Sequence, residues 1–394
     1  MTSSSITETI WKTRLDKLKA SNLLRKMRII ESPMGSVVDT SEGARINFCS
    51  NDYLGLANHL EIKKTLADAA LRWGTGAAAS RLVSGNTRAH VKLEQEMAEF
   101  MEAETAVLFP SGYQANVGAL SSLTESGDAI FSDQLVHASI IDGARLSRAK
   151  VHIFHHLDME HLDELLQKKK TKGLNLIVTD AIFSMDGDKA NLPRLAELAE
   201  KHNAVLYVDE AHALGVVGRE GRGLTAECNL ANQVTIRIGT FGKAYGATGA
   251  VVACSKNAAG LIRSGARSLL YTTAMPPPLA ETLLKSMEIV RHSDDLRERL
   301  MSNVSLFRSL AEQSRLPVLE SSTPIQPVLV GSAARAVNVS ERLFERGFFI
   351  QGIRPPTVPE GMSRLRVVLT AHHQKEQITK LVEAMSATLA EIES

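Results

Sequence analysis

The chain has 394 residues, of which 44% are hydrophobic and 23% charged, with a formal net charge of +1. This composition is typical of a globular protein, and the length exceeds one ordinary hydrophobic core, so we expect two or three structural units. A net charge near zero gives no reason to expect nucleic acid or an anionic membrane as a partner.

The remaining bulk features favour a cytoplasmic protein without a metal site. The three cysteines, at positions 49, 228 and 254, are too far apart in sequence for a metal-binding pattern or a disulfide framework, which favours a reducing compartment. The first residues lack the basic-then-apolar order of a signal peptide, and no apolar run approaches the roughly 20 residues that span a bilayer.

Residues 1–50 are predicted to form a helical arm followed by a strand pair. Residues 5–30 mix apolar and basic positions at helical spacing, without one strong apolar face. Val37–Phe48 predicts two strands around the turn residues Ser41-Glu-Gly43.

From about residue 100 to residue 255, short apolar runs alternate with helix-length segments. The predicted strands are Thr105–Phe109, Ala129–Ser132, Val151–Phe154, Leu174–Thr179, Val205–Val208, Val234–Ile238 and Ala250–Ala253. Apolar runs joined in this way are typical of an α/β fold, with a mainly parallel sheet covered by helices on both faces. We therefore predict a large domain over residues 51–285.

Beyond Pro276-Pro-Pro278 the order of elements changes. Its predicted elements are two helices at about 279–315, a strand at Ile325–Val330, a helix at 334–346, strands at Phe348–Ile353 and Leu365–Thr370, and a terminal helix. Strands set between helices in this order predict a smaller α+β domain over residues 286–394.

Polar candidates follow the ends of the predicted parallel strands. Ligands of such sheets bind at the carboxyl ends of the strands, which meet at one edge. We therefore expect a single site that contains Ser111, Gly112, Tyr113, His137, Ser184, Asp209, His212 and Lys243.

Lys243 is the most informative of these residues, because it places an amine among small residues with room for a flat group. Asp209 ends an apolar strand about 30 residues upstream. A lysine and an acid suit pyridoxal phosphate (PLP), which needs a Schiff-base lysine and a carboxylate at its ring nitrogen. In this interpretation His212 could reach the phenolic oxygen of the ring, and His137 could stack on the ring.

A phosphate site is predicted where Phe109-Pro-Ser-Gly-Tyr113 passes from a strand through a tight turn into a helix. Amides at a helix N-terminus bind phosphate, so Ser111, Gly112 and Tyr113 are candidates. Thr240, three residues before Lys243, could meet the same phosphate.

Other interpretations stay open at this point. Val205–His212 is also typical of helicase-like NTPases, but these need Gly-x-x-x-x-Gly-Lys-Ser/Thr, and here Ala244 follows Lys243. The segment could also be a buried strand end with a paired acid, in a protein without catalytic activity. The histidines at 152, 155 and 156 have loosely metal-like spacing without a cysteine or acid that completes a zinc site, and they are predicted to be surface groups.

Five segments, in order along the chain, resemble the α-oxoamine synthases, fold-type I PLP enzymes that join an amino acid to an acyl thioester. The segments are Asn47-Phe-Cys-Ser-Asn-Asp-Tyr-Leu-Gly-Leu56, Ser184-Met-Asp-Gly-Asp188, Asp209-Glu-Ala-His212, Thr240-Phe-Gly-Lys243 and Tyr271-Thr-Thr-Ala-Met-Pro-Pro277. The resemblance runs from about residue 10 to the end of the chain. It implies a PLP-dependent transferase that forms homodimers with shared active sites.

The resemblance also assigns roles by position. It implies that Lys243 holds the cofactor as a Schiff base, with Asp209 and His137 as its catalytic partners. The implied cofactor-binding residues are Gly112, Tyr113, His137, Ser184, Asp209, His212, Thr240 and Lys243, together with Thr273, which would serve the neighbouring subunit. The implied substrate-binding residues are Arg25, Asn51, His137, Arg354 and Thr357.

Ile325–Val330 and the segment Ile353-Arg-Pro-Pro-Thr-Val-Pro-Glu-Gly361 are most similar to members that condense L-alanine with a pimeloyl thioester. The thioester would be carried by coenzyme A or by an acyl carrier protein, and members that use glycine or serine are the alternative. The chain departs from the family pattern at Gly76-Ala-Ala-Ala-Ser-Arg81, at Asp180, where many members have glutamate, and at Ala213, where many have glycine.

Overall fold

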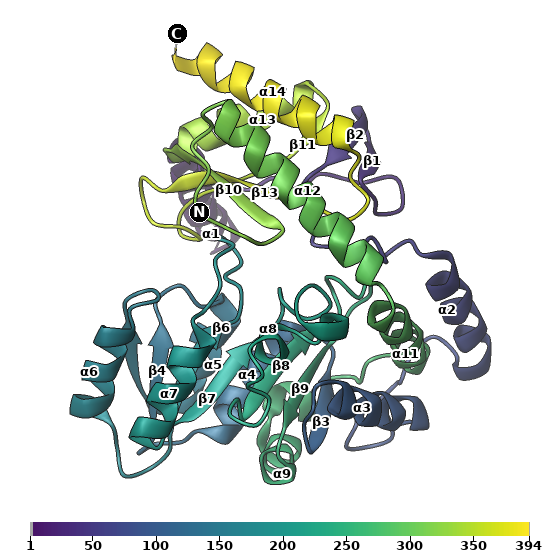
Figure 1. The fold of residues 1–394 in the computed structure, drawn as a ribbon, viewed down its shortest axis with the longest axis vertical. Helices are drawn as coiled ribbons and strands as arrows, with labels where there is room; N and C mark the ends of the chain where they lie inside the picture. The colour runs from purple at the N-terminus through teal and green to yellow at the C-terminus, as the bar shows by residue number, and fades with distance from the viewer. Residues whose placement is uncertain (1–2, 394) are drawn as a thin grey trace. The chain divides into compact units, whose positions relative to one another are not determined.

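The computed structural model describes residues 3–393, which divide into two compact units (Figure 1). The large unit consists of Asn51–Ser184 and Asp188–Glu298. The small unit joins the described residues up to Ser50 with Met185–Gly187 and the residues from Arg299 onward. The boundary between the large and the small unit, between Glu298 and Arg299, falls within helix α12 (Asp294–Gln313).

A seven-stranded sheet in the order β3-β9-β8-β7-β6-β4-β5 forms the centre of the large unit. Its strands are β3 (Thr105–Phe109), β4 (Ala129–Asp133), β5 (Lys150–Phe154), β6 (Asn175–Asp180), β7 (Val205–Asp209), β8 (Ile236–Thr240) and β9 (Ala250–Cys254). Strands β4 to β8 pair in parallel, whereas β9 is antiparallel to both β8 and β3. The predicted α/β fold with a mainly parallel sheet is confirmed, and each predicted strand lies within two residues of an observed one.

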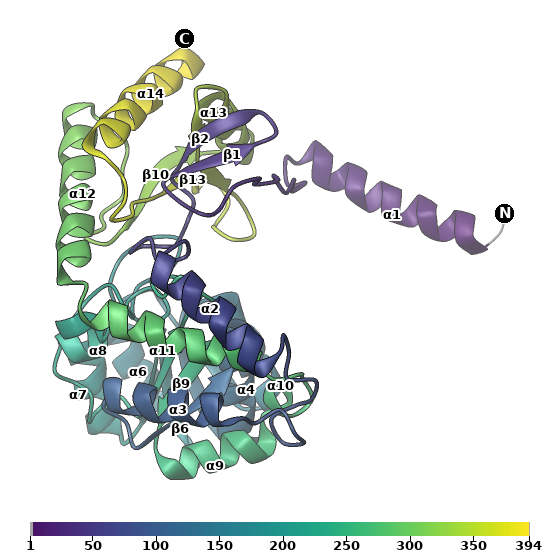
Figure 2. The ribbon, with the colours of Figure 1, turned by 90° about the vertical axis from the view of Figure 1, so that its right-hand side faces the viewer.

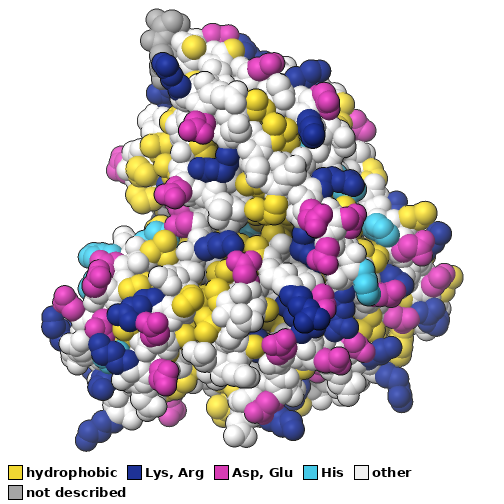
Figure 3. Space-filling model, viewed as in Figure 1, with side chains coloured by type: hydrophobic (Ala, Val, Ile, Leu, Met, Phe, Trp, Pro, Cys, Tyr) yellow, Lys and Arg dark blue, Asp and Glu magenta, His cyan; other side chains and the backbone are white. Residues whose placement is uncertain are grey.

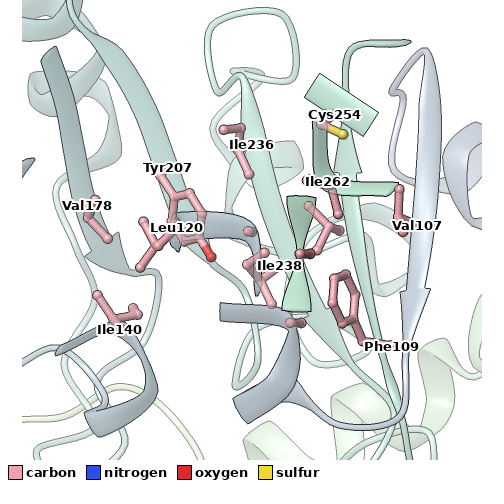
Figure 4. Close-up of a cluster of buried hydrophobic side chains, with 14 of the residues drawn as sticks. Val107, Phe109, Leu120, Ile140, Val178, Tyr207, Ile236, Ile238, Cys254 and Ile262 are labelled. Atoms are coloured by element: carbon pink, nitrogen blue, oxygen red, sulfur yellow. The ribbon is translucent and has the colours of Figure 1, made fainter. Parts of the chain in front are cut away.

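Almost every residue of β4, β6, β7, β8 and β9 is buried, because helices cover both faces of the sheet. Helices α4 (Gly112–Leu123), α5 (Ala138–Ser147) and α9 (Lys256–Gly265) form a hydrophobic core with one face. Figure 4 shows side chains of this core, from Val107 on β3 to Val178 on β6. The other helices are α2 (Leu60–Trp73), α3 (Arg88–Phe100), α6 (Met159–Lys169), α7 (Leu192–His202), α8 (Leu224–Glu227), α10 (Arg267–Leu270) and α11 (Pro277–Arg291), with a 3₁₀ turn, η1 (Arg219–Gly221).

The small unit contains two three-stranded sheets, β1-β2-β11 and β10-β13-β12. Its elements are α1 (Ser3–Ala20), β1 (Val37–Thr40), β2 (Gly43–Asn47), β10 (Ile325–Gly331), α13 (Ala333–Glu345), β11 (Phe348–Phe349), β12 (Gln351–Ile353), β13 (Ser363–Val368), α14 (Lys375–Glu393) and most of α12. The strand predicted over Phe348–Ile353 is split in two, because β11 pairs with β2 while β12 pairs with β13 of the other sheet.

The predicted N-terminal helix is confirmed up to Ala20 and wrong beyond it. Asn22 adopts the left-handed conformation, with φ at 55°, and the amide of Leu23 donates to the carbonyl of Leu18 at 2.8 Å. A left-handed residue ends a helix in this way, because the amide that follows it turns back and donates to one of the last carbonyls of the helix. Figure 2 shows α1 extending away from the strands of its own unit.

Within residues 3–393, no helix is both long and apolar enough to cross a membrane. Figure 3 shows acidic and basic side chains interspersed over the face in view. This mixture agrees with the net charge of +1 and presents no extended region of one sign on that face.

Candidate functional site

A cavity of about 250 Å³ lies in the large unit, where the parallel strands end. The predicted site residues that line it are Asn51, Ser111, Gly112, Tyr113, His137, Ser184, Asp209, His212, Thr240 and Lys243. The lining also includes Asn116, Ser139, Asp180, Ile182 and Thr248. The predicted residues therefore line one cavity at the carboxyl ends of the parallel strands, where ligands of such sheets bind.

Asp209 ends β7 and is only 4% exposed. One of its carboxylate oxygens accepts a hydrogen bond from the side-chain amide of Asn116 at 2.7 Å, and the other accepts from the amide of Ala211 at 2.9 Å. Asn116 is held in turn, because its side-chain oxygen accepts from the hydroxyl of Tyr207 at 2.6 Å. This buried network fixes the orientation of the Asp209 carboxylate.

Asn116 and Tyr207 were not predicted from the sequence. Asn116 lies on α4, which is otherwise apolar along its buried face, and it is 1% exposed. A buried amide in such a helix requires partners, and this is the signal that could have identified it.

Lys243 lies in the loop that joins β8 to β9. The loop is closed by the amide of Phe241, which donates to the carbonyl of Gly249 at 2.9 Å. The amine of Lys243 lies 3.4 Å from the hydroxyl of Thr240, at the end of β8. A lysine in this short closed loop can present its amine to a flat ligand in the cavity.

The N-terminus of α4 opens onto the same cavity. Ser111 caps the helix by accepting from the amide of Gln114 at 3.2 Å, which leaves the amides of Gly112 and Tyr113 without partners inside the helix. A Cβ atom at Gly112 would lie 2.6 Å from the Cγ2 atom of Thr240, so only glycine allows this close approach. The result is an anion-binding end beside a threonine hydroxyl, as a phosphate group requires.

His137 caps α5, where its Nδ1 atom accepts from the amide of Ser139 at 3.3 Å and lies 2.7 Å from the hydroxyl of the same serine. The ring borders the cavity and is open to it. Desolvation by the surrounding protein lowers the pKa of His137, an effect that Asp209 opposes and Lys243 reinforces. A neutral imidazole suits stacking on a flat ring better than a charged, hydrated one does.

Asp180 and Asp209 are register partners on β6 and β7, but their surroundings differ. Asp180 accepts one hydrogen bond, from the amide of His137 at 3.2 Å, and its other carboxylate oxygen has no partner. Burial raises the pKa of Asp180 well above its ordinary value, and the nearby charge of Asp209 raises it further. Burial and the neighbouring Asp209 therefore favour the protonated form of Asp180, which lines the cavity.

His212 is held by a residue that the sequence did not reveal as part of the site. Its Nδ1 atom lies 2.6 Å from the hydroxyl of Tyr53, and both side chains are buried. His212 also lines the cavity, so its ring can contact a ligand there.

Other predicted site residues lie outside this cavity. Arg25, Arg354 and Thr357 belong to the small unit, where Arg25 donates to the hydroxyl of Thr357 at 3.1 Å and Arg354 donates to the carbonyl of Asn22. Thr273 lies in the large unit with its side chain exposed, and it does not line the cavity.

The cavity fits PLP on its donor and acceptor groups alone. It offers a buried carboxylate for the ring nitrogen, an amine for the aldehyde carbon, a histidine for the phenolic oxygen and a helix N-terminus for the phosphate.

Comparison with known proteins assigns the family. Residues 44–385 match the family model described as aminotransferase class I and II. An 8-amino-7-oxononanoate synthase from Trichlorobacter lovleyi is 46% identical over 375 residues, which cover 95% of this chain and 96% of that protein. The chain belongs to the α-oxoamine synthase family. A second 8-amino-7-oxononanoate synthase, from Thermoanaerobacter pseudethanolicus, is 42% identical and covers 95% of both chains.

Solved structures of α-oxoamine synthases share the fold. A serine palmitoyltransferase from S. paucimobilis, with a bound PLP–myriocin aldimine, matches with a TM-score of 0.93 at 26% identity over 100% of both chains. An 8-amino-7-oxononanoate synthase from Francisella tularensis matches with a TM-score of 0.77 at 29% identity, covering 89% of this chain and 99% of that chain. The predicted family and fold type are therefore confirmed.

Proposed function

We propose that this α-oxoamine synthase is a PLP-dependent 8-amino-7-oxononanoate synthase, an acyltransferase of biotin biosynthesis that acts on L-alanine and a pimeloyl thioester. The observation that carries the proposal is the convergence of Lys243, Asp209, His137 and His212 on one cavity. The identity of 42–46% with synthases of that name, over 95% of the chain, supports the choice of substrates.

PLP, when bound, supplies an electron sink that makes the Cα proton of an amino acid acidic. Lys243 would hold the cofactor through its amine, and the same amine, when free, would accept that proton. Asp209, held by Asn116, would keep the ring nitrogen of the cofactor protonated, and the helix N-terminus at Gly112 would hold its phosphate. His137 would stack on the ring and exclude water.

The overall reaction balances as a decarboxylative condensation. A bond forms between Cα of alanine and the thioester carbonyl carbon, and the C–S bond breaks to release the thiol. The alanine carboxylate then leaves as carbon dioxide, and a proton returns to the same carbon to give 8-amino-7-oxononanoate.

The small unit supplies the proposed substrate-binding residues. Arg25 and Arg354 line one groove of about 540 Å³ within that unit, together with Lys26, Arg28 and Glu341, and Arg28 is paired with Glu341. Guanidinium groups bind carboxylates in paired hydrogen bonds, so this basic groove suits an acidic substrate. Arg25, Arg354 and Thr357 are the proposed substrate-binding residues of the small unit, and Asn51 and His137 are those of the large unit. Coenzyme A and an acyl carrier protein are both open as acyl carriers.

Serine is the second candidate for the amino donor, favoured by the TM-score of 0.93 with a serine palmitoyltransferase. A panel of alanine, glycine and serine, each supplied with pimeloyl-CoA and the purified protein, would separate the candidates. We expect release of free thiol with alanine, and a preference for serine or glycine would overturn the choice of substrate while leaving the family intact.

The central test is Lys243→Ala, compared with Lys256→Ala on the exposed side of α9. We expect Lys243→Ala to abolish turnover and the visible absorbance of lysine-bound PLP, because it removes both the anchor and the base. Lys256→Ala should retain both. Full activity of Lys243→Ala would refute the proposed mechanism.

A homodimer is also proposed, with Thr273 reaching the cofactor phosphate of the neighbouring subunit. The support is that Trp11, Leu15 and Leu18 of α1, at helical spacing on one face, are 43–53% exposed. Light scattering of the protein with Trp11→Ser and Leu15→Ser should show a weaker dimer than the unchanged protein.

A cytoplasmic location is also proposed, supported by three free cysteines in the structure.

A further inference from the structure

His156 is not the surface histidine that the sequence predicted. Its side chain is only 21% exposed and lies between two carboxylates. Nδ1 is 2.9 Å from a carboxylate oxygen of Asp133, and Nε2 is 2.7 Å from one of Asp188. The ring also meets the ring of Phe183 edge-on, at 4.4 Å between centroids.

The geometry favours a protonated ring. Each nitrogen of His156 faces a carboxylate oxygen that can only accept, and only the imidazolium form has an N–H on both nitrogens. Burial alone would lower the pKa of His156, but the hydrogen bonds and charges of Asp133 and Asp188 outweigh it and raise the pKa to about 10. The three side chains thus form an Asp–His–Asp clamp with one net negative charge.

No metal accounts for this arrangement. In the part of the chain that the structure describes, no group of histidine, cysteine and acidic residues could hold a metal ion. Both ring nitrogens of His156 are engaged by carboxylates, which leaves neither lone pair for a metal.

One end of the clamp is fixed to the central sheet. Asp133 is the last residue of β4 and is 2% exposed. Its carboxylate also accepts from the amides of Leu135 at 2.8 Å and Leu157 at 3.0 Å. Asp133 therefore has little freedom to move, and it fixes the position of His156.

The other end of the clamp holds a hairpin that borders the cofactor cavity. The amide of Phe183 donates to the carbonyl of Asp188 at 3.0 Å, and the amide of Ala190 donates to the carbonyl of Ala181 at 3.0 Å. These bonds pair the two sides of hairpin 181–190. Ile182 and Ser184, on the first side of the hairpin, line the cavity that contains Lys243.

We propose that His156, held between Asp133 and Asp188, is a positioning residue that fixes hairpin 181–190 and thereby places Ser184 against the cofactor. His156 itself does not line the cavity and acts through the hairpin. The inference rests on the proposed PLP site, and it adds a residue that the family resemblance did not assign.

The test uses the apoprotein, titrated with PLP and followed by absorbance. His156→Gln leaves the carboxylates of Asp133 and Asp188 facing each other without a cation, and we expect PLP affinity to fall about tenfold. Asp188→Asn removes one of the two anions, so the double variant His156→Gln with Asp188→Asn should recover part of that loss. His155→Gln is the matched control, because the side chain of His155 is exposed and does not belong to the clamp.

Two outcomes would overturn the proposal. One is a PLP dissociation constant of His156→Gln within about twofold of the control. The other is a double variant whose loss equals the sum of the two single losses, because independent sites add and members of one clamp do not. A general loss of packing would not produce the selective recovery in the double variant.

A measurement without PLP keeps the test decisive if His156→Gln fails to fold. Histidine-selective ¹⁵N NMR of the unchanged apoprotein should show one imidazolium at about pH 8, well above the ordinary histidine pKa. That signal should be absent from Asp188→Asn or should titrate at lower pH. A neutral His156 at about pH 8 would refute the clamp, whereas failure of the unchanged protein to bind PLP would refute the proposed function instead.

Discussion

Asn116→Ala tests the network that holds the central carboxylate. The substitution removes the bond of 2.7 Å to Asp209, and hydrogen bonds to charged groups contribute about 1.5–3 kcal/mol. It also leaves the hydroxyl of Tyr207, which is fully buried, without its acceptor, at a cost of about 1–3 kcal/mol. We therefore expect the free energy of unfolding of the apoprotein to fall by about 2.5–6 kcal/mol.

The assay is urea unfolding of the apoprotein, followed by circular dichroism. Because a chain with two units need not unfold in one step, the comparison uses the same transition under matched conditions. Adding Tyr207→Phe removes the stranded hydroxyl and should return about 1–3 kcal/mol of the loss. The reasoning would be refuted if the free energy of unfolding of Asn116→Ala lay within about 0.5 kcal/mol of that of the unchanged protein. Strictly additive losses of stability from Asn116→Ala and Tyr207→Phe in the double variant would also refute it.

Three further predictions concern other groups. Asp180→Asn should keep PLP affinity within about threefold, because burial already disfavours a charge on Asp180, whereas Asp209→Asn should lower PLP affinity about a hundredfold; equal losses in the two titrations would contradict this. Gly112→Ala should weaken PLP binding about tenfold through the 2.6 Å contact, and adding Thr240→Ser, which lacks the Cγ2 methyl, should restore it; no recovery would show that the contact is irrelevant. Burial lowers the pKa of His373 to about 4, so the unfolded state binds more protons between about pH 6.5 and pH 4 and stability falls as the pH drops through this window. Urea unfolding should show that His373 lowers the free energy of unfolding by about 2 kcal/mol between pH 7 and pH 5. The stability of His373→Gln should therefore depend less steeply on pH. An equally steep pH dependence in His373→Gln would refute the assignment to His373.

The strands of the large unit were predictable because each is a short apolar run between helix-length segments. β3 (Thr105–Phe109) is observed with the predicted bounds, since its residues are almost all buried and its limits follow hydrophobicity. The end of α1 was not predictable in the same way. It depends on the backbone conformation of Asn22, and the sequence beyond it still carries apolar and basic residues at helical spacing.

The candidate site divides along similar lines. Residues that follow strand ends were predictable, since parallel strands bring these positions to one edge. Tyr53 and Asn116 were not, because they meet their partners His212 and Asp209 across 159 and 93 residues of sequence. The ion pairs of His156 were not predictable for the same reason, since its acidic partners lie 23 and 32 residues away and no short motif joins them.

Asp180 and Asp209 show what sequence position alone leaves undecided. Both end parallel strands, in register with each other, and both line the cavity. Asp209 accepts from the side chain of Asn116 and the amide of Ala211, whereas Asp180 accepts from one amide and keeps an unpartnered oxygen. A carboxylate in a buried site needs such donors, and two adjacent anions would repel each other. The side chain of Asn116 therefore determines which of the two acids can serve the cofactor as an anion, and the strand ends do not.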